Sequence, residues 1–388
     1  MTILWIYNLP LIPEAGGTER ITSLIAKGLS QRGHKCLGIL EFKEGSTQMV
    51  YEGHNVEDLY EFLKENKVDV IINQIAYSRW LLRDFLERGG AKWHAEGGKI
   101  ISCLHFDPCN PSYIQLLRSA ERLTFRQYVS LVKQYVLMPY YKNRQRQNEG
   151  SIYNYIYQHS DALIILSSSH IAYLMKVMQR QEYSKIQAIG NALTFPEIAK
   201  ESIVDHKNKT VLVCSRMLEY HKRITLILRA WNIVKQKSTA HEWRLVIVGD
   251  GPDLPRYKKQ VSDKGIKDVE FVGQQNPAEY YEKSSILLVA SSAEGWGLNI
   301  TEGLQYGVVP VVMESSSVYK EMIDSMKNVI LTPNNNVKAF SNAILMLMSD
   351  PKRLRAMQLN ALHSATRFTL DRTINKWQNL LEKLSQLN

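Results

Sequence analysis

The chain has 388 residues, which is enough for two domains, and its 45% hydrophobic and 22% charged residues are typical of a globular protein. The formal net charge of +10 favours anionic partners, a class that includes nucleotides, nucleic acids and anionic membrane surfaces. No apolar run approaches the roughly 20 residues of a membrane-spanning helix, and four cysteines without CxxC spacing argue against a zinc site and predict reduced thiols in a cytosolic protein.

Short apolar runs, each followed by a turn and a helical pattern, recur along the whole chain. They cover residues 3–7, 36–42, 68–74, 99–106, 161–167 and 185–191, and then 210–216, 244–250, 269–273, 285–291, 307–313 and 328–332. Continuous Val, Ile and Leu runs are typical of strands buried on both faces, and their alternation with helices indicates parallel sheets. We therefore expect an α/β protein with two doubly wound domains.

The domain boundary is predicted in the polar segment 196–209, which gives an N-terminal domain of residues 1–198 and a C-terminal domain of residues 199–369. The final segment, 370–388, has helical periodicity and no strand after it. We expect it to pack back on the first domain. The apolar N-terminus lacks a basic region and a cleavage site, so it predicts a strand and not a signal peptide.

Two features of the first half could face a ligand. Gly16 and Gly17 follow the first strand and open a helical pattern, where a backbone without side chains can approach a ligand; an ordinary tight turn explains them equally well. His105 lies at the end of the fourth strand, a position where a single histidine is more often a packing residue than a catalytic one.

Residues 114–149 interrupt the alternation with a long helical pattern. The cations are Arg118, Arg122, Arg126, Lys133, Lys142, Arg144 and Arg146, and the acidic residues are only Glu121 and Glu149. The first three arginines are four residues apart and share a helix face. This pattern fits a basic amphipathic helix on an anionic membrane, and it fits equally a solvated charged face over an ordinary core.

In the second half, cations and glycines follow the predicted strands. Arg216 stands at the end of the strand 210–216 and Lys222 at the start of the next helical pattern, and two such cations can neutralise a diphosphate. Taken alone, this is a weak signal, because lysine and arginine are usually surface residues. The Gly-Asp-Gly-Pro sequence at 249–252 is a turn signal and lacks the GxGxxG dinucleotide pattern.

The segment EGWGLNITEG, residues 294–303, predicts a strand end, a glycine loop and a helix start. Asn299 and Glu302 have capping-box spacing, with Asn299 as the N-cap. Glu294 then lies at the carboxyl end of a parallel strand, where ligands bind in open α/β sheets. The loop amides of residues 295–298 could donate to a phosphate. A cap alone would explain Glu302, but it would not explain Glu294.

Together these motifs resemble glycosyltransferase family 4, whose members are retaining enzymes of GT-B fold that use nucleotide sugars. The motifs are GGTER with RGHK, SR…HKR, VGDGP, FVG and EGWGLNITEGLQYGVVPVV, in the family's order and over nearly the whole chain. The two glutamates of the last motif form the EX7E element, which is the most specific part of the resemblance.

The resemblance implies a role for each matching residue. Glu294 contacts the transferred sugar as a catalytic residue, and His105 lies near the reacting sugar. The diphosphate is held by Arg216, Lys222, Gly17, Leu298 and Thr301. The loop of Gly295, Trp296 and Gly297 meets the sugar, while Glu302 binds the ribose and Val272 lies near the base. No metal or other cofactor is expected.

The sequence departs from the family pattern at four positions. Ser215 replaces a glycine before Arg216, and Arg223 stands after Lys222 where glycine is common. Trp296 replaces phenylalanine, and Gly303 replaces alanine. None of the four removes a charged contact.

The sequence thus predicts a cytoplasmic retaining glycosyltransferase, peripheral on the inner face of the cell membrane. It would move a hexose-type sugar from a nucleotide sugar, with UDP favoured, to a lipid-linked or polysaccharide acceptor. One alternative is a glycosidase or phosphorylase with Glu294 and Glu302 as its carboxyl pair. Another is a non-enzymatic nucleic-acid-binding protein that owes its affinity to the net charge of +10.

Overall fold

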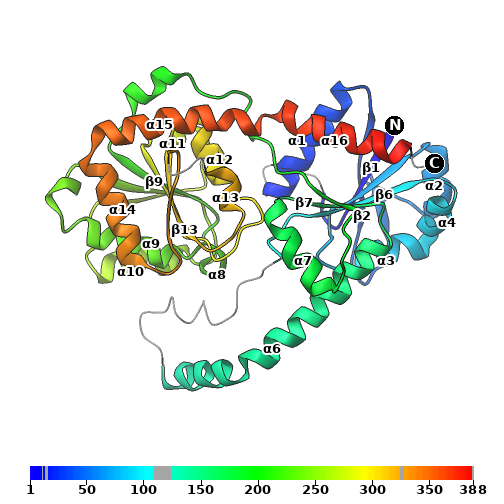
Figure 1. Ribbon diagram of the computed structural model, residues 1–388, viewed down its shortest axis with the longest axis horizontal. Helices are drawn as coiled ribbons and strands as arrows, with labels where there is room; N and C mark the ends of the chain where they lie inside the picture. Colours follow the sequence, from blue (N-terminus) through cyan, green and yellow to red (C-terminus); the bar gives the residue numbers. More distant parts are fainter. Residues whose placement is uncertain (11, 14–15, 109–123, 324–326, 387–388) are drawn as a thin grey trace. The chain divides into compact units, whose positions relative to one another are not determined.

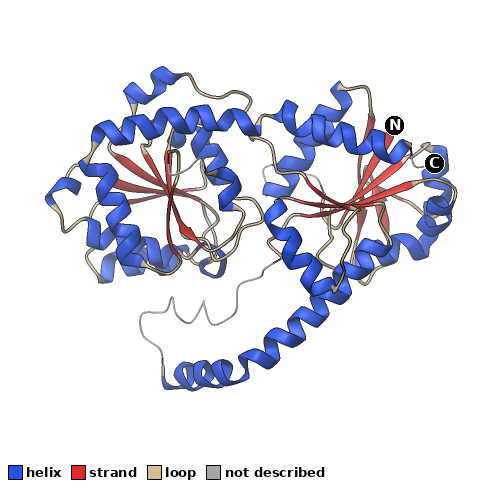
Figure 2. Ribbon diagram, in the orientation of Figure 1, coloured by secondary structure: helices blue, strands red, loops and turns tan. Residues whose placement is uncertain are grey.

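The computed structural model describes residues 1–10, 12–13, 16–108, 124–323 and 327–386 (Figure 1). The chain divides into two compact units. The first unit consists of Met1–Pro108, Met138–Thr194 and Thr369–Asn388, and the second of Cys109–Leu137 and Phe195–Phe368. In each unit a twisted sheet has helices on both faces, as Figure 2 shows, which confirms the predicted fold class.

The first unit contains an eight-stranded sheet in the order β4-β3-β2-β1-β5-β6-β7-β8. Its strands are β1 (Thr2–Tyr7), β2 (Lys35–Phe42), β3 (Met49–Tyr51), β4 (His54–Asn55), β5 (Val70–Asn73), β6 (Lys99–Leu104), β7 (Ala162–Ile165) and β8 (Ile186–Ala188). The six predicted strands pair in parallel, whereas β3 and β4 add an antiparallel hairpin at one edge that we did not predict.

The helices of the first unit cover both faces of this sheet. They are α1 (Gly17–Gln31), α2 (Leu59–Glu65), α3 (Trp80–Phe85), α4 (Ala91–Ala95), α7 (Ile171–Met178) and α16 (Leu370–Ser385), together with the last turns of α6 (Phe125–Gln158). The C-terminal helix α16 lies beside α1 (Figure 1). Close packing explains Gly28 of α1, because a Cβ atom there would lie 2.5 Å from Ile374 Cγ1.

The second unit contains a six-stranded parallel sheet in the order β11-β10-β9-β12-β13-β14. Its strands are β9 (Thr210–Cys214), β10 (Arg244–Val248), β11 (Val269–Gly273), β12 (Ile286–Val289), β13 (Val309–Glu314) and β14 (Ile330–Pro333). All six were predicted. Strands β12 and β9 are buried along nearly their whole length, as expected for a sheet covered on both faces.

The helices of the second unit connect these strands. They are α8 (Glu219–Lys222), α9 (Ile224–Val234), α10 (Leu254–Asp263), α11 (Pro277–Lys283), α12 (Leu298–Gln305), α13 (Tyr319–Met322), α14 (Val337–Ser349) and α15 (Pro351–Ala365). In the part of the chain that is described, no helix has both the length and the apolar character needed to cross a membrane. Cys36, Cys103 and Cys214 form no disulfide.

Candidate active site

The second sheet changes winding direction at β9, which lies between β10 and β12. In open α/β sheets, ligands bind outside the carboxyl ends of the strands at such a point. Arg216 follows β9, and Glu294 lies in the loop between β12 and α12. The topology therefore brings two separately predicted site segments to the same sheet edge.

Lys222 and Glu294 form an ion pair between Nζ and Oε1, with side chains that are 23% and 13% exposed. Ser292 ties their two segments together. Its backbone N–H donates to the carbonyl of His221 over 2.7 Å, and its hydroxyl donates to the carbonyl of Tyr220 over 2.8 Å. The loop after β12 is therefore held against α8, and the predicted cation and carboxylate are direct neighbours.

His221 lies beside these charges and was not among the predicted residues. Burial lowers the pKa of its imidazole, and Lys222 and Arg216 lower it further, while Glu294 acts in the opposite direction. The imidazole is therefore uncharged at neutral pH, and Arg216 and Lys222 carry the positive charge here. The only signal for His221 in the sequence was its position next to Lys222.

Arg223 ends α8 in a left-handed conformation with φ of 48° and is 1% exposed. Its guanidinium donates to the carbonyls of Ala290 and Ser291, at the end of β12, and to the side-chain oxygens of Asn334 and Asn335, which follow β14. Burial lowers the pKa of Arg223 to about 10. This side chain therefore links the segments that follow β12 and β14, and its guanidinium is buried inside the protein and not exposed beside Lys222 and Glu294.

Helix α12 begins at Leu298, and its N-cap is Gly297 with φ of 93°. The predicted capping box with Asn299 as N-cap is wrong. Gly297 takes the cap because it adopts the left-handed conformation without a steric penalty. The Asn299 side chain instead donates to the carbonyl of Cys214 at the end of β9, over 3.3 Å.

The side chains of Trp296 and Thr301 are turned into the protein. Trp296 is 5% exposed and packs edge-on against Phe368 with ring centroids 5.8 Å apart. Thr301 is fully buried, and its hydroxyl donates to the carbonyl of Leu298 over 3.0 Å. Trp296 therefore fixes the loop after Glu294, and a donor sugar would meet the backbone of this loop and not the indole ring.

Glu302 is 4% exposed and accepts a hydrogen bond from the Tyr281 hydroxyl, over 3.0 Å. Tyr281, on α11, is fully buried between the rings of Phe195 and Tyr306. Burial raises the pKa of Tyr281 well above its usual range, so it stays protonated and donates. Sequence reasoning missed Tyr281, because nothing in the local pattern links α11 to α12.

The two remaining glycine motifs of the second half meet at neighbouring strand ends. The backbone N–H of Gly249, after β10, donates to the carbonyl of Gly273, at the end of β11, over 2.7 Å. Val272, the residue predicted near the base, is half-buried and directly precedes Gly273 in β11. The site segments of the second unit thus occupy the carboxyl ends of β11, β10, β9 and β12.

In the first unit, His105 follows β6, and its Nε2 lies 2.6 Å from Oε1 of the buried Gln74, which follows β5. Thr22 of α1 lies 3.2 Å from the same oxygen. Burial lowers the pKa of His105 to about 4, so its imidazole is neutral with a proton on Nε2. Gly17 is the exposed first residue of α1, which follows β1. His105 and Gly17 therefore lie at the carboxyl edge of the first sheet.

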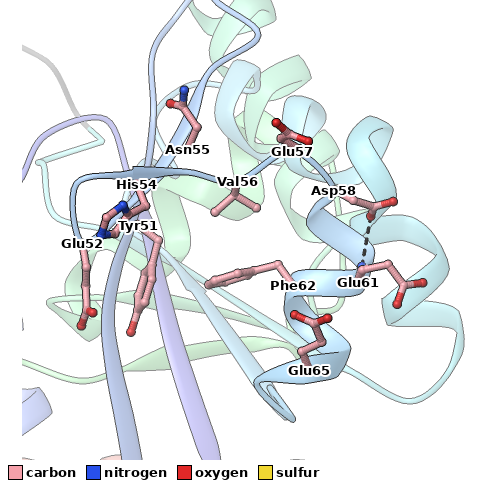
Figure 3. Close-up of a pocket in the computed structure, with 10 residues that line it drawn as sticks. All are labelled: Tyr51, Glu52, His54, Asn55, Val56, Glu57, Asp58, Glu61, Phe62 and Glu65. Atoms are coloured by element: carbon pink, nitrogen blue, oxygen red, sulfur yellow. Dashed lines mark hydrogen bonds between the residues drawn. The ribbon is translucent and has the colours of Figure 1, made fainter.

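A pocket of about 370 Å³ lies between the β3–β4 hairpin and α2 (Figure 3). Its acidic lining residues are Glu52, Glu57, Asp58, Glu61 and Glu65. This negative lining is unsuited to a diphosphate, so the pocket is not the donor site. Over the described ranges, no three His, Cys, Asp or Glu residues are grouped to hold a metal ion.

Comparisons with known proteins show what the second unit is similar to. Residues 195–363 match the family model of glycosyl transferases group 1. An uncharacterized glycosyltransferase of Haemophilus influenzae is 26% identical over 200 residues, which are 51% of this chain and 55% of that protein. The alpha-1,4-N-acetyl-D-galactosaminyltransferase of Campylobacter jejuni, which acts on a diNAcBac-PP-undecaprenol glycan, is 26% identical over 59% of this chain and 62% of its own length. The chain thus spans a little over half the length of these relatives.

Solved structures match over the whole chain. HepE of Anabaena, in complex with UDP, has a TM-score of 0.70 at 14% identity and covers 99% of this chain and 100% of its own. The lipopolysaccharide outer core galactosyltransferase WaaB has a TM-score of 0.66 at 18% identity and covers 99% of both chains. These likenesses confirm the GT-B fold. In residues 195–363, the chain is similar to the glycosyl transferases group 1.

Proposed function

We propose that the protein is a retaining glycosyltransferase that moves a hexose-type sugar from a UDP-sugar to a lipid-linked or polysaccharide acceptor in cell-envelope glycan synthesis. The observation that carries the proposal is the ion pair of Lys222 and Glu294, beside Arg216, at the β9–β12 switch point. Support for the donor and acceptor classes comes from relatives, since HepE binds UDP and the Campylobacter enzyme acts on an undecaprenol-linked glycan. We place the protein in the cytoplasm, peripheral on the inner face of the cell membrane.

The cations would act on the leaving diphosphate. Arg216 offers two parallel donors and Lys222 a point charge, so together they would stabilise negative charge that develops on the phosphate as the glycosidic bond breaks. A bound diphosphate would give Lys222 a second anionic partner. Glu294 could then direct an oxygen toward hydroxyl groups of the transferred sugar.

The proton of the acceptor hydroxyl needs no enzymic base in this proposal. The leaving phosphate oxygen takes the proton on the same face of the sugar, so the configuration at the anomeric carbon is retained. His105 is neutral and tied to Gln74 through Nε2. We assign it a role in positioning the sugar by hydrogen bonding. Glu302, held by Tyr281, would accept hydrogen bonds from the ribose hydroxyls.

The test is Lys222→Ala, with Lys258→Ala on the exposed surface of α10 as the matched control. Transfer from labelled UDP-, GDP- and ADP-sugars to extracted membrane lipids and polysaccharide would be measured. Loss of one charged contact to a transferring phosphate costs about 2–4 kcal/mol of transition-state stabilisation, which is roughly a 30- to 1,000-fold loss of kcat/KM. Near wild-type transfer by Lys222→Ala would refute the assigned site. Sugar release from glycans without any nucleotide sugar would support the glycosidase alternative.

A further inference from the structure

The first half of α6 presents an apolar stripe to solvent. Its members are Phe125, Tyr128, Val129, Val132 and Val136, which are 83%, 58%, 49%, 46% and 73% exposed. At about 100° per residue, these five positions fall within an arc of roughly 100° on one helix face. The last turns of the same helix behave differently. There Ile156 is fully buried in the core of the first unit, whereas the five residues of the stripe are exposed.

Cations border this stripe. Arg126 and Lys133 are exposed and, at about 100° per residue, both lie roughly 80–100° around the helix from Phe125. Residues 124–148 contain five cations, Arg126, Lys133, Lys142, Arg144 and Arg146, and no aspartate or glutamate. The surface therefore combines a continuous apolar row with an uncompensated positive edge.

An anionic bilayer fits both properties. A second copy of the chain could cover the stripe but would bring two positive edges together, which is unfavourable for a chain of net charge +10. A nucleic acid would pair with the cations but leave the valines in water. In a membrane interface, the apolar face enters the boundary between headgroups and acyl chains, and the cations reach the lipid phosphates.

We propose that the stripe from Phe125 to Val136 lies in the interface of an anionic phospholipid bilayer, with Arg126 and Lys133 at the headgroups. This inference rests on the peripheral membrane location given in the proposed function and names the surface that binds the membrane. It does not depend on the transfer chemistry. Of the arginines 118, 122 and 126 predicted to share a helix face, only Arg126 is within the described residues. The exposed valines identify a different and more specific feature than charge alone.

The test compares two single substitutions that change charge equally. Val132→Asp places a carboxylate in the stripe, whereas Ser130→Asp places one on an exposed position about 160° away around the helix. Full-length protein would be sedimented with vesicles of phosphatidylcholine and phosphatidylglycerol, and with phosphatidylcholine alone. One unit charge near the surface is worth about 1 kcal/mol, or about fivefold in partitioning. We expect about fivefold weaker binding for Ser130→Asp and at least 30-fold weaker binding for Val132→Asp, which also loses apolar burial.

A second pair of variants tests the positive edge. Arg126→Glu with Lys133→Glu is expected to weaken binding to the anionic vesicles at least 30-fold, and Lys258→Glu with Lys352→Glu, which are exposed elsewhere, far less. The proposal is overturned if wild-type protein does not bind anionic vesicles, or if Val132→Asp and Ser130→Asp bind equally. It is also overturned if Val132→Asp dissociates a dimer without changing vesicle binding. The thermal shift produced by UDP, measured on each variant, reports separately on the donor site.

Discussion

At Arg223 we predict that substitution by glycine lowers stability less than substitution by alanine, which is the reverse of the order in an ordinary helix. The side chain is 1% exposed and its guanidinium makes hydrogen bonds of 2.7 Å to Asn335 Oδ1, 2.7 Å to the Ser291 carbonyl and 2.9 Å to Asn334 Oδ1, besides its bond to Ala290. Each such bond is worth about 1.5–3 kcal/mol, but desolvation of the charge cancels part of the sum. We expect Arg223→Ala to lower the free energy of unfolding of the second unit by about 3–5 kcal/mol.

Arg223→Gly removes the same hydrogen bonds and yet should be less destabilising than Arg223→Ala. The backbone at this position is left-handed, with φ of 48°, which costs a residue with a Cβ about 1–2 kcal/mol. We therefore expect the glycine variant to be about 1 kcal/mol more stable than the alanine variant. In an ordinary helix interior the order is opposite, so Lys258→Gly in α10 should be about 1 kcal/mol less stable than Lys258→Ala.

The measurement must report on the second unit alone, because a chain of two units need not unfold in one step. Hydrogen exchange of the amides of β9 and β12, followed by mass spectrometry in increasing urea, provides the free energy of opening for that unit. If Arg223→Ala is at least as stable as Arg223→Gly while the Lys258 pair shows its normal order, the conformational part of the reasoning is wrong. If both Arg223 variants have the same free energy of opening as the wild type, the hydrogen bonds of Arg223 do not contribute to stability.

Two further predictions concern groups that hold the site. Tyr281→Phe removes the hydrogen bond to Glu302 without a large change of volume. The loss of about 1–1.5 kcal/mol should weaken UDP binding about 5- to 10-fold, as measured by calorimetry. Unchanged affinity would mean that Glu302 does not bind the nucleoside. Stability should also fall with acid through His105, whose pKa in the folded protein is lowered to about 4 from an ordinary value of 6.5. Between these values the unfolded chain binds the proton and the folded chain does not, so up to about 3 kcal/mol of stability is lost as the pH falls from 6.5 to 4. His105→Gln should flatten this part of the stability profile, and an unchanged slope would contradict the assignment.

The sequence was sufficient to predict the strands, which follow from the apolar runs, and the site residues that come directly after them. The continuous apolar runs placed all six strands of the second sheet, and parallel topology then collected Arg216 and Glu294 at one edge. The hairpin of β3 and β4 was missed because its strands are only 3 and 2 residues long, too short to show a strand pattern in the sequence. Such short edge strands depend on pairing with β2 and not on their own composition.

The sequence was insufficient where tertiary contacts compete with local ones. Asn299 has the residue type and spacing of an N-cap, but its side chain finds the carbonyl of Cys214, and the flexible backbone of Gly297 supplies the cap. The partner of Glu302 lies on α11, which is far from it in sequence, so the carboxylate could be proposed for the site but the tyrosine that orients it could not.

The replacement of glycine by Arg223 shows why charge alone is a poor guide to a donor site. Beside Lys222 in the sequence, a second cation suggests a second phosphate contact. A glycine would satisfy the left-handed backbone there without strain, so an arginine requires compensation, and the buried hydrogen bonds to β12 and to the segment after β14 supply it. Because these bonds fix the loops that carry Lys222 and Glu294, we infer that Arg223 acts on the rigidity of the proposed donor site. It adds no positive charge to the surface that would face the diphosphate.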